Sequence, residues 1–435
     1  AKELKMDEYR SINVYELVSR DLPLSEGLPI MGSLWAYAIK YDAEGKFIKL
    51  NPRWCIMGGN MPRDKYEAYS TVVRFSVIKV LICIRVTYRS KFDTKLIDFH
   101  FDCSNAFQAT RTDVKSEKLT PLYCEQAAGF RQRDINGNAY VCKVLVAHQG
   151  RIDSARLFGQ AFHKLMIAAG LRELVYAPKA YMWHAGPLAG SSASLNDILS
   201  RCEDMPAIDG APPGWACFGQ HVDDSAGVAS SQSVINYIMG AIQVTYSCKM
   251  ARWDKVLGYT ITVNDYEHFS TATLSCKPII EAAINRHLRS KGEPVLTHKN
   301  PYPSDLKTRL SKGITPDPNS PEYKPYIAMQ LECRSLLGLL IWVSEAYPQI
   351  KYVVNFACAY MAEPSLSVCI VAKIALQHIY WQPLSVTWGG PGCKSLEAVE
   401  TLPLPFTVDG YVNYGLMAFS DSNVDTPSIS GTLIM

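Results

Sequence analysis

Apolar and polar residues alternate between residues 97 and 103, which is the period of a β-strand with one face in a core and the other face open. The apolar side would carry Ile97, Phe99, Phe101 and Cys103, and the polar side Asp98, His100 and Asp102. An aromatic residue, Phe107, follows shortly after the last carboxylate. The segment therefore predicts a strand whose end delivers Asp102 to an open face.

A second acidic site is predicted at Asp223 and Asp224, which two short strand-like runs flank in the manner of a hairpin tip. Because strands of one sheet lie about 4.8 Å apart, this tip and the end of the Asp102 strand can lie close together. Three carboxylates so gathered would repel one another without cations, and two metal ions about 3.5–4 Å apart would suit phosphoryl transfer. Each motif also has an ordinary interpretation, since Asp favours solvated turns and an acid at a strand end is commonly just exposed.

The remaining pattern indicates an α+β protein, with strands in its first part and mainly helices after Thr273. Strand-like alternation covers residues 34–40, 46–50, 122–126, 139–146, 255–261 and 414–421. Helical spacing covers residues 75–86, 153–170, 278–289, 330–346, 349–361 and 365–380, and an amphipathic piece is expected at 9–18. The Gly-, Pro-, Ser- and Ala-rich residues 184–213 predict a surface insertion, and residues 301–324 and 383–405 predict connectors.

Composition narrows the function only slightly. The 435 residues, 48% hydrophobic and 20% charged, describe a globular protein of two to four domains. With a net charge of +3, any nucleic-acid surface must be local. The 13 cysteines include no C-x-x-C pair, which argues against zinc ribbons and for reduced thiols. Apolar runs such as 336–343 are too short to span a bilayer. No signal peptide opens the chain, and a first residue other than Met suggests a processed product.

Basic residues gather at three places that could bind phosphate. The hairpin of residues 34–50 carries Lys40, Lys46 and Lys49, and Arg53 follows; ordinary solvated strand faces explain them equally well. Arg151 and Arg156 flank the start of the helix that Asp153 or Ser154 would cap, where a helix N-terminus favours anions. The third group, at the end of the helix 278–289, consists of Arg286, Arg289 and Lys291.

Taken in order, these motifs resemble the reverse transcriptase of a copia-type LTR retrotransposon over about residues 7–435. Residues 102–108 (DCSNAFQ) resemble the family's D-V-K-N-A-F-L, and residues 221–224 (HVDD) its Y-V-D-D. Residues 123–130 resemble Y-M-E-Q-P-P-G-F, and 150–158 the G-L-K-Q-A-P-R-A-W motif. Further likenesses lie at the fingers hairpin (35–59), L-G (257–258), the thumb motifs (333–342 and 347–350) and the start of RNase H (420–425 and 428–431).

The resemblance implies a right-hand polymerase fold with an antiparallel palm sheet, fingers and a helical thumb. Its expected division is fingers and the start of the palm at 1–100, palm with the insertion near 184–213 at 101–272, thumb at 273–382, connector at 383–410, and a truncated start of an RNase H-like domain at 411–435. Asp421 matches the first acid of that last domain, but the other carboxylates of its metal site are absent. Cleavage of an RNA strand by this chain is therefore not expected.

The resemblance also implies roles for individual residues. Asp102 and Asp223 would be the main ligands of two Mg²⁺ ions, with Mn²⁺ as a substitute, and Asp224 would be the third carboxylate. Phe107 would lie under the incoming sugar and exclude a 2′-hydroxyl, although a core aromatic is its ordinary interpretation. The remaining nucleotide contacts would come from Lys40, Arg53 and Gly150, and the primer and template contacts from His221, Val222, Leu257 and Gly258.

Three positions depart from the family pattern. His221 replaces the usual Tyr near the primer end, and Asn51 replaces a Lys of the fingers. Asp153 replaces the usual Gln beside the nucleotide, which places an extra negative charge near a triphosphate unless Arg151 or Arg156 offsets it.

The leading hypothesis is an RNA-directed DNA polymerase that uses dNTPs and an RNA or DNA template with a paired primer, as a homodimer or within a larger ribonucleoprotein. It would act inside the cell, in cytoplasmic virus-like particles or in the nucleus, without a membrane. The alternative is a domesticated, catalytically inactive subunit with a structural or RNA-binding role. The truncation, His221, Asp153 and the low net charge favour the alternative, whereas the three carboxylates, Phe107 and Arg53 oppose it. A kinase or a nuclease of the host has no supporting phosphate loop.

Overall fold

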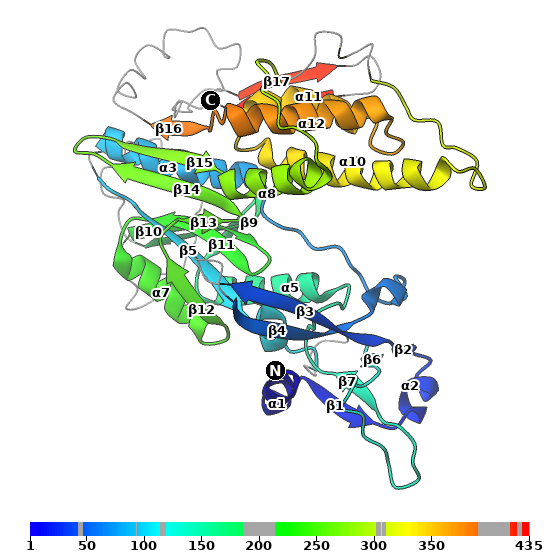
Figure 1. Ribbon diagram of the computed structural model, residues 1–435. Coiled ribbons are helices and arrows are strands. Elements are labelled where there is room, and N and C mark those ends of the chain that lie inside the picture. Colours follow the sequence, from blue (N-terminus) through cyan, green and yellow to red (C-terminus); the bar gives the residue numbers. More distant parts are fainter. Residues whose placement is uncertain are drawn as a thin grey trace. The chain divides into compact units, whose positions relative to one another are not determined.

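The chain has a mixed α+β fold that divides into two compact units (Figure 1). The computed structural model describes residues 1–41, 47–92, 94–113, 119–185, 214–301, 306, 310–389, 418–423 and 429–434. The first unit contains Ala1–Leu81 and the described residues 96–185 and 214–252; the second contains residues 82–95 and those from 253 onward. The long helix α3 (Phe75–Phe92) thus contributes residues to both units.

The N-terminal part of the first unit combines a small sheet with the predicted basic hairpin. Strands β3 (Ser33–Tyr41) and β4 (Phe47–Ile56) form this antiparallel hairpin. The expected amphipathic piece at 9–18 is wrong, because the left-handed backbone of Asn13 (φ 50°) separates a helix from a strand. The other elements here are α1 (Lys2–Ser11), β1 (Tyr15–Val18), α2 (Asp21–Ser25), β2 (Ile30–Met31), η1 (Gly58–Asn60), β6 (Leu122–Cys124) and β7 (Val141–Val144), with sheet order β1-β7-β6-β2.

A histidine lies in the core beneath this sheet. His148 is fully buried, with its ring centroid 5.4 Å from that of Tyr9 and 5.1 Å from that of Trp54. Burial penalises the charged imidazolium and lowers the pKa of His148 to about 4. The ring is therefore neutral in the folded protein near pH 7.

We expect acid to destabilise the fold through His148. Because its folded-state pKa of about 4 lies below the ordinary value of 6.5, its full contribution to stability is present above about pH 6.5. As the pH falls towards 4, the free energy of unfolding should drop by about 3 kcal/mol. His148→Met should reduce the difference between the unfolding free energies measured in urea at about pH 7 and about pH 4. His268→Met, at an exposed histidine, should leave it unchanged. An unaltered pH dependence in the His148 variant would contradict this account.

The centre of the first unit is a six-stranded sheet in which every neighbouring pair is antiparallel, in the order β12-β5-β11-β10-β9-β8. The predicted strand is β5 (Ile97–Ser104), and the predicted acidic hairpin is β10 (Gly214–His221) with β11 (Asp224–Ala229). The others are β8 (Arg172–Leu174), β9 (Ala177–Ala185) and β12 (Ser247–Ala251). The expected surface insertion at 184–213 lies almost wholly outside the described residues.

Two helices, α5 (Ser154–Ala168) and α7 (Gln232–Gln243), share one hydrophobic core with the apolar face of β5. Phe99 and Phe101 of the strand pack in this core with Phe158 and Phe162 of α5 and with Ile235 and Ile238 of α7. The alternation of β5 is thus confirmed on its apolar side. It is wrong for Asp98, which is buried because Arg252 covers it with a bidentate ion pair.

The second unit combines a four-stranded antiparallel sheet with helices. The predicted strand at 255–261 is wrong, because Leu257 and Gly258, both with positive φ, turn the chain into a hairpin. The three predicted helices are confirmed, and α10 begins earlier, inside the expected connector. The elements are β13 (Lys255–Val256), β14 (Tyr259–Asp265), β15 (Ser270–Ser275), α8 (Lys277–His287), η2 (Arg289–Lys291), α10 (Tyr323–Val343), η3 (Pro348–Ile350), α11 (Lys351–Cys358), α12 (Leu366–Trp381), β16 (Thr387–Gly389), β17 (Ala418–Asn423) and β18 (Ile429–Ile434).

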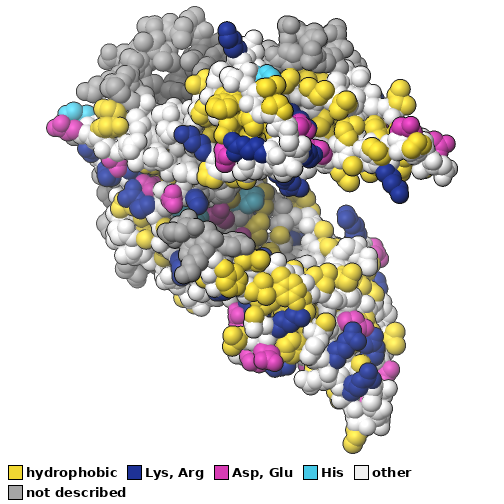
Figure 2. Space-filling model, in the orientation of Figure 1, with side chains coloured by type: hydrophobic (Ala, Val, Ile, Leu, Met, Phe, Trp, Pro, Cys, Tyr) yellow, Lys and Arg dark blue, Asp and Glu magenta, His cyan; other side chains and the backbone are white. Residues whose placement is uncertain are grey.

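Charged side chains link the helices of this unit. Glu332 of α10 lies 3.5 Å from His287 and 3.8 Å from Lys373, and it contacts Lys291; Arg289 contacts Glu281. Two cations of the predicted basic edge are therefore already paired with acids. On the face drawn in Figure 2, Lys and Arg lie in separate groups interspersed with Asp and Glu. By length and composition alone α10 could cross a membrane, which for a single helix is weak evidence.

Candidate functional site

The register of β5 against β11 brings the predicted acids together. Asp102 is the direct cross-strand partner of Asp224, and the Cys103 N–H donates to the Asp223 carbonyl over 3.0 Å. Because Cys103 and Asp223 are thus joined by a ladder hydrogen bond, Asp102 and Asp224 form the adjacent, non-hydrogen-bonded pair, in which Cα atoms lie only about 4.5 Å apart. The acids, more than a hundred residues apart in sequence, meet at one end of the sheet.

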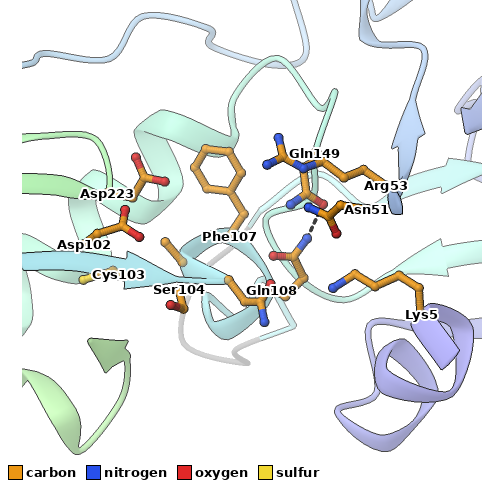
Figure 3. Close-up of a pocket in the computed structure, with 12 residues that line it drawn as sticks. Lys5, Asn51, Arg53, Asp102, Cys103, Ser104, Phe107, Gln108, Gln149 and Asp223 are labelled. Carbon is orange, nitrogen blue, oxygen red and sulfur yellow. Dashed lines mark hydrogen bonds between the residues drawn. The ribbon is translucent and has the colours of Figure 1, made fainter. Parts of the chain in front are cut away.

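A cavity of about 290 Å³ opens beside these acids. The carboxylates of Asp102 and Asp223 lie next to each other at one side, Arg53 lies across from them, and Phe107 stands between (Figure 3). Lys5 reaches the cavity from α1. The lining residues, all in the first unit, are Lys5, Asn51, Arg53, Asp102, Cys103, Ser104, Asn105, Ala106, Phe107, Gln108, Gln149 and Asp223.

The turn that presents Asp223 is strained. Val222 has a φ of 55°, a conformation that is unusual for a β-branched residue and costs of order 1–3 kcal/mol. Two contacts hold it there: the Val222 side chain packs against the core of the sheet, and Gln220 Nε2 donates to the Val222 carbonyl over 3.0 Å. Such strain is typical of functional sites, where the surrounding structure over-determines a loop. Here it fixes the position of one carboxylate.

The third carboxylate is engaged by a histidine. Asp224 Oδ1 lies 2.6 Å from His100 Nε2, and Asp224 is not among the residues that line the cavity. Accordingly, within the described part of the chain, no group of three or more His, Cys, Asp or Glu residues is arranged to hold a metal ion. Asp102 and Asp223 remain as two hard oxygen donors facing one cavity. Mg²⁺ is typically bound by one or two carboxylates together with substrate phosphates, so these two residues fit it.

The cavity has a cationic side that the sequence indicated only in part. Arg53 lines it as expected, and Asn51 lines it as well. Lys40 lies in β3 opposite Lys49, but its side chain is outside the described residues. Lys5, which the sequence analysis missed, contacts Glu8 at 2.8 Å.

No sequence signal pointed to Lys5, because α1 is held at the site by a tertiary contact. The Asn105 amide nitrogen donates to Glu8 Oε1 over 2.9 Å. This bond joins the helix to the segment that follows β5.

Asp153, which replaces the usual Gln of the family motif, is paired with an arginine of the same segment. Arg151 donates to both oxygens of Asp153, over 2.5 and 3.0 Å, and both side chains are buried. Arg156 lies 4.0 Å from the same carboxylate. Asp153, one of the two expected caps, occupies the N-cap position of α5 but makes no side-chain capping hydrogen bond. Arg151, enclosed in this pair, is not exposed to a phosphate.

Gly150 is required by chain packing. Its φ is 85°, and a Cβ there would lie 2.0 Å from the Ile56 carbonyl oxygen. Gly150 is not among the lining residues, whereas Gln149 before it is, in contact with Gln108. The close approach that the sequence predicted is thus made to β4.

We expect Gly150→Ala to destabilise the protein far more than Gly137→Ala. Both glycines have a φ near 84°, but nothing lies within 4 Å of a Cβ on Gly137. The left-handed backbone alone costs about 1–2 kcal/mol, and the clash with Ile56 adds about 1–3 kcal/mol at position 150 only. Thermal or urea unfolding of the two variants measures the difference; equal losses would show that the contact with Ile56 is not tight.

The predicted primer and template residues lie in different units. His221 ends β10 as the cross-strand partner of Asp224, and Val222 follows it in the turn. Leu257 and Gly258 form the β13–β14 turn of the second unit. A Cβ on Gly258 would meet the ring of Trp342 at 3.0 Å. Their roles toward nucleic acid stay predictions.

Comparison with known proteins gives limited support. No family model matches the chain. It is similar to an uncharacterized mitochondrial protein of Arabidopsis thaliana, with 26% identity over 159 residues, which is 37% of this chain and 59% of that protein. The chain thus spans less than two thirds of this relative's length. A structure of telomerase from Candida albicans, in complex with a fragment of telomeric RNA, aligns with 93% of this chain and 69% of its own, at 10% identity and a TM-score of 0.31. A TM-score that low carries no weight for the fold.

Proposed function

We propose that this chain is an RNA-directed DNA polymerase of a retroelement, which extends a primer with dNTPs. The observation that carries the proposal is the meeting of Asp102 and Asp223 at one cavity that also presents Phe107 and Arg53. The collinear resemblance of its motifs to copia-type reverse transcriptases supports the same activity. On this proposal the six-stranded sheet is the palm, the β3–β4 hairpin belongs to the fingers, and the helices of the second unit form the thumb.

On this proposal, each residue of the cavity has its own role in nucleotidyl transfer. Asp102 and Asp223 would hold Mg²⁺, and bound Mg²⁺ would supply Lewis-acid activation of the primer 3′-hydroxyl and charge for the leaving pyrophosphate. Arg53 would bind the triphosphate through its planar fork of donors. Phe107, whose ring packs edge-on against Phe158 with centroids 6.3 Å apart, is held firmly enough to be a steric floor for the sugar. His100 would position Asp224, the third acid.

We expect Asp223→Asn and Asp102→Asn to abolish Mg²⁺-dependent incorporation of dNTPs on an RNA template. Each replacement removes one of two anionic metal donors. Mutating a residue that merely hydrogen-bonds to a metal ligand typically lowers activity roughly 10- to 100-fold, so primer extension should fall by more than that. Asp64→Asn, at an exposed aspartate of the same unit, is the matched control and should retain activity.

Two outcomes would count against this assignment. Undiminished extension by Asp223→Asn would remove that residue from the site. A parent protein that is folded but inactive with Mg²⁺ and Mn²⁺ would favour the domesticated, inactive subunit.

We expect Phe107→Ala to admit ribonucleotides. Removing the ring would open space that a 2′-hydroxyl could occupy, so the ratio of rNTP to dNTP incorporation should rise by about 10-fold or more. That is the discrimination that one or two methylene-sized groups in a pocket provide. The measurement is single-nucleotide extension with each substrate, and dNTP incorporation by the same variant is the internal control. An unchanged ratio would show that Phe107 is only a core aromatic.

A further inference from the structure

Two thiols face each other directly beneath the acidic site. Cys103 of β5 and Cys248 of β12 are direct cross-strand partners, and their Sγ atoms lie 2.8 Å apart. Both belong to the first unit and both are free cysteines. Cys103 follows Asp102 in the chain, and its N–H holds the Asp223 carbonyl. The thiol pair is thus bonded through the backbone to both acids that line the cavity.

The strand register suits a bond between these two sulfurs. Because the N–H of Cys103 points toward β11, Cys103 and Cys248 form a non-hydrogen-bonded pair toward β12, with Cα atoms about 4.5 Å apart. That separation lies inside the range of about 4.4–6.8 Å found across disulfides. Only a small shift of the two strands is needed to bring the sulfurs into bonding distance.

One member of the pair borders the cavity, and the other is slightly exposed. Cys103 lines the 290 Å³ cavity, which is several times the roughly 30 Å³ that a water molecule occupies in the liquid. Cys248 is 8% exposed, against 2% for Cys103. The more exposed Cys248 is therefore the thiol that a peroxide meets first.

We propose that Cys103 and Cys248 are a redox modification site, which a peroxide converts to a disulfide that displaces the end of β5. The expected effect on catalysis rests on the proposed polymerase function, whereas formation of the disulfide does not.

The reaction with hydrogen peroxide balances without any further reactant. The Cys248 thiolate attacks one peroxide oxygen, an S–O bond forms, the O–O bond breaks, and hydroxide leaves and takes up a proton as water. The Cys103 sulfur, losing its proton, then attacks the Cys248 sulfenic acid; an S–S bond forms and a second water leaves. Two thiols and one peroxide thus give one disulfide and two waters, with the sulfurs oxidised and the peroxide reduced.

The disulfide would change the geometry of the acids. Its Cβ atoms lie about 3.8 Å apart, whereas cross-strand Cβ atoms lie about 4.5–5.5 Å apart. Closing the bond therefore draws β5 and β12 together by roughly 0.7–1.7 Å at the residue next to Asp102. A misplacement of about 1 Å can reduce a reaction about 100-fold. Reduction of the disulfide should restore the rate.

Peptide mapping tests the modification itself. The full chain is treated with one equivalent of hydrogen peroxide, blocked with an alkylating agent, digested without reduction and examined by mass spectrometry. We expect a cross-linked pair of peptides containing Cys103 and Cys248. Cys124 and Cys142, a cross-strand pair that is more deeply buried, should react later. Oxidation of that pair or of other thiols while Cys103 and Cys248 remain alkylated would overturn the proposal.

Primer extension tests the coupling. Peroxide should lower the rate of the parent by up to about 100-fold, and dithiothreitol should restore it. Cys248→Ala should keep its activity in peroxide, whereas Cys217→Ala, at another buried thiol of the same sheet, should be as sensitive as the parent. A cross-linked parent of full activity would overturn the coupling, and so would equal sensitivity of Cys248→Ala. If the reduced parent has no polymerase activity, the proposed function fails while the peptide map still decides the modification.

Discussion

The antiparallel register between β5 and β11 is the constraint on which the candidate site depends. It makes Asp102 and Asp224 a close cross-strand pair and places Asp223 at the turn beside them. Gathering anions in this way opposes folding, so the surrounding structure must compensate. The apolar face of β5 provides that compensation, because its phenylalanines pack with α5 and α7 in one core. The same packing holds Val222 in its strained backbone conformation.

Local pairing of charges shapes what the cavity can bind. Arg151 forms an ion pair with Asp153, and Arg252 forms one with Asp98. His100 contacts Asp224. Asp98 and Asp153, the acids buried within the described residues, thus each have a cationic partner, as burial of charge requires. Arg53, at the side of the cavity opposite the two carboxylates, presents a cation to it. The result is a polar cavity with separate anionic and cationic sides, which suits a substrate that carries both a metal-binding phosphate and further negative charge.

The two sides of β5 have different consequences. Toward β11 the strand places the acids, and toward β12 it places Cys103 against Cys248. On the proposed coupling, a disulfide at the thiols would shift Asp102, because Cys103 follows Asp102 directly in the chain.

The sequence by itself determined the elements whose signals are local: the alternation of β5, the hairpins at 34–50 and 214–229, α5, and the three C-terminal helices. It also indicated the acids and Phe107, because a strand period and a turn motif lie within a few residues. Only the tertiary structure decided the burial of Asp98 by Arg252, the approach of Gly150 to Ile56, the arrival of Lys5 at the cavity and the pairing of His100 with Asp224. Those contacts join residues that are far apart along the chain or lie on neighbouring strands, and strand register, which no local pattern encodes, fixes which of them meet.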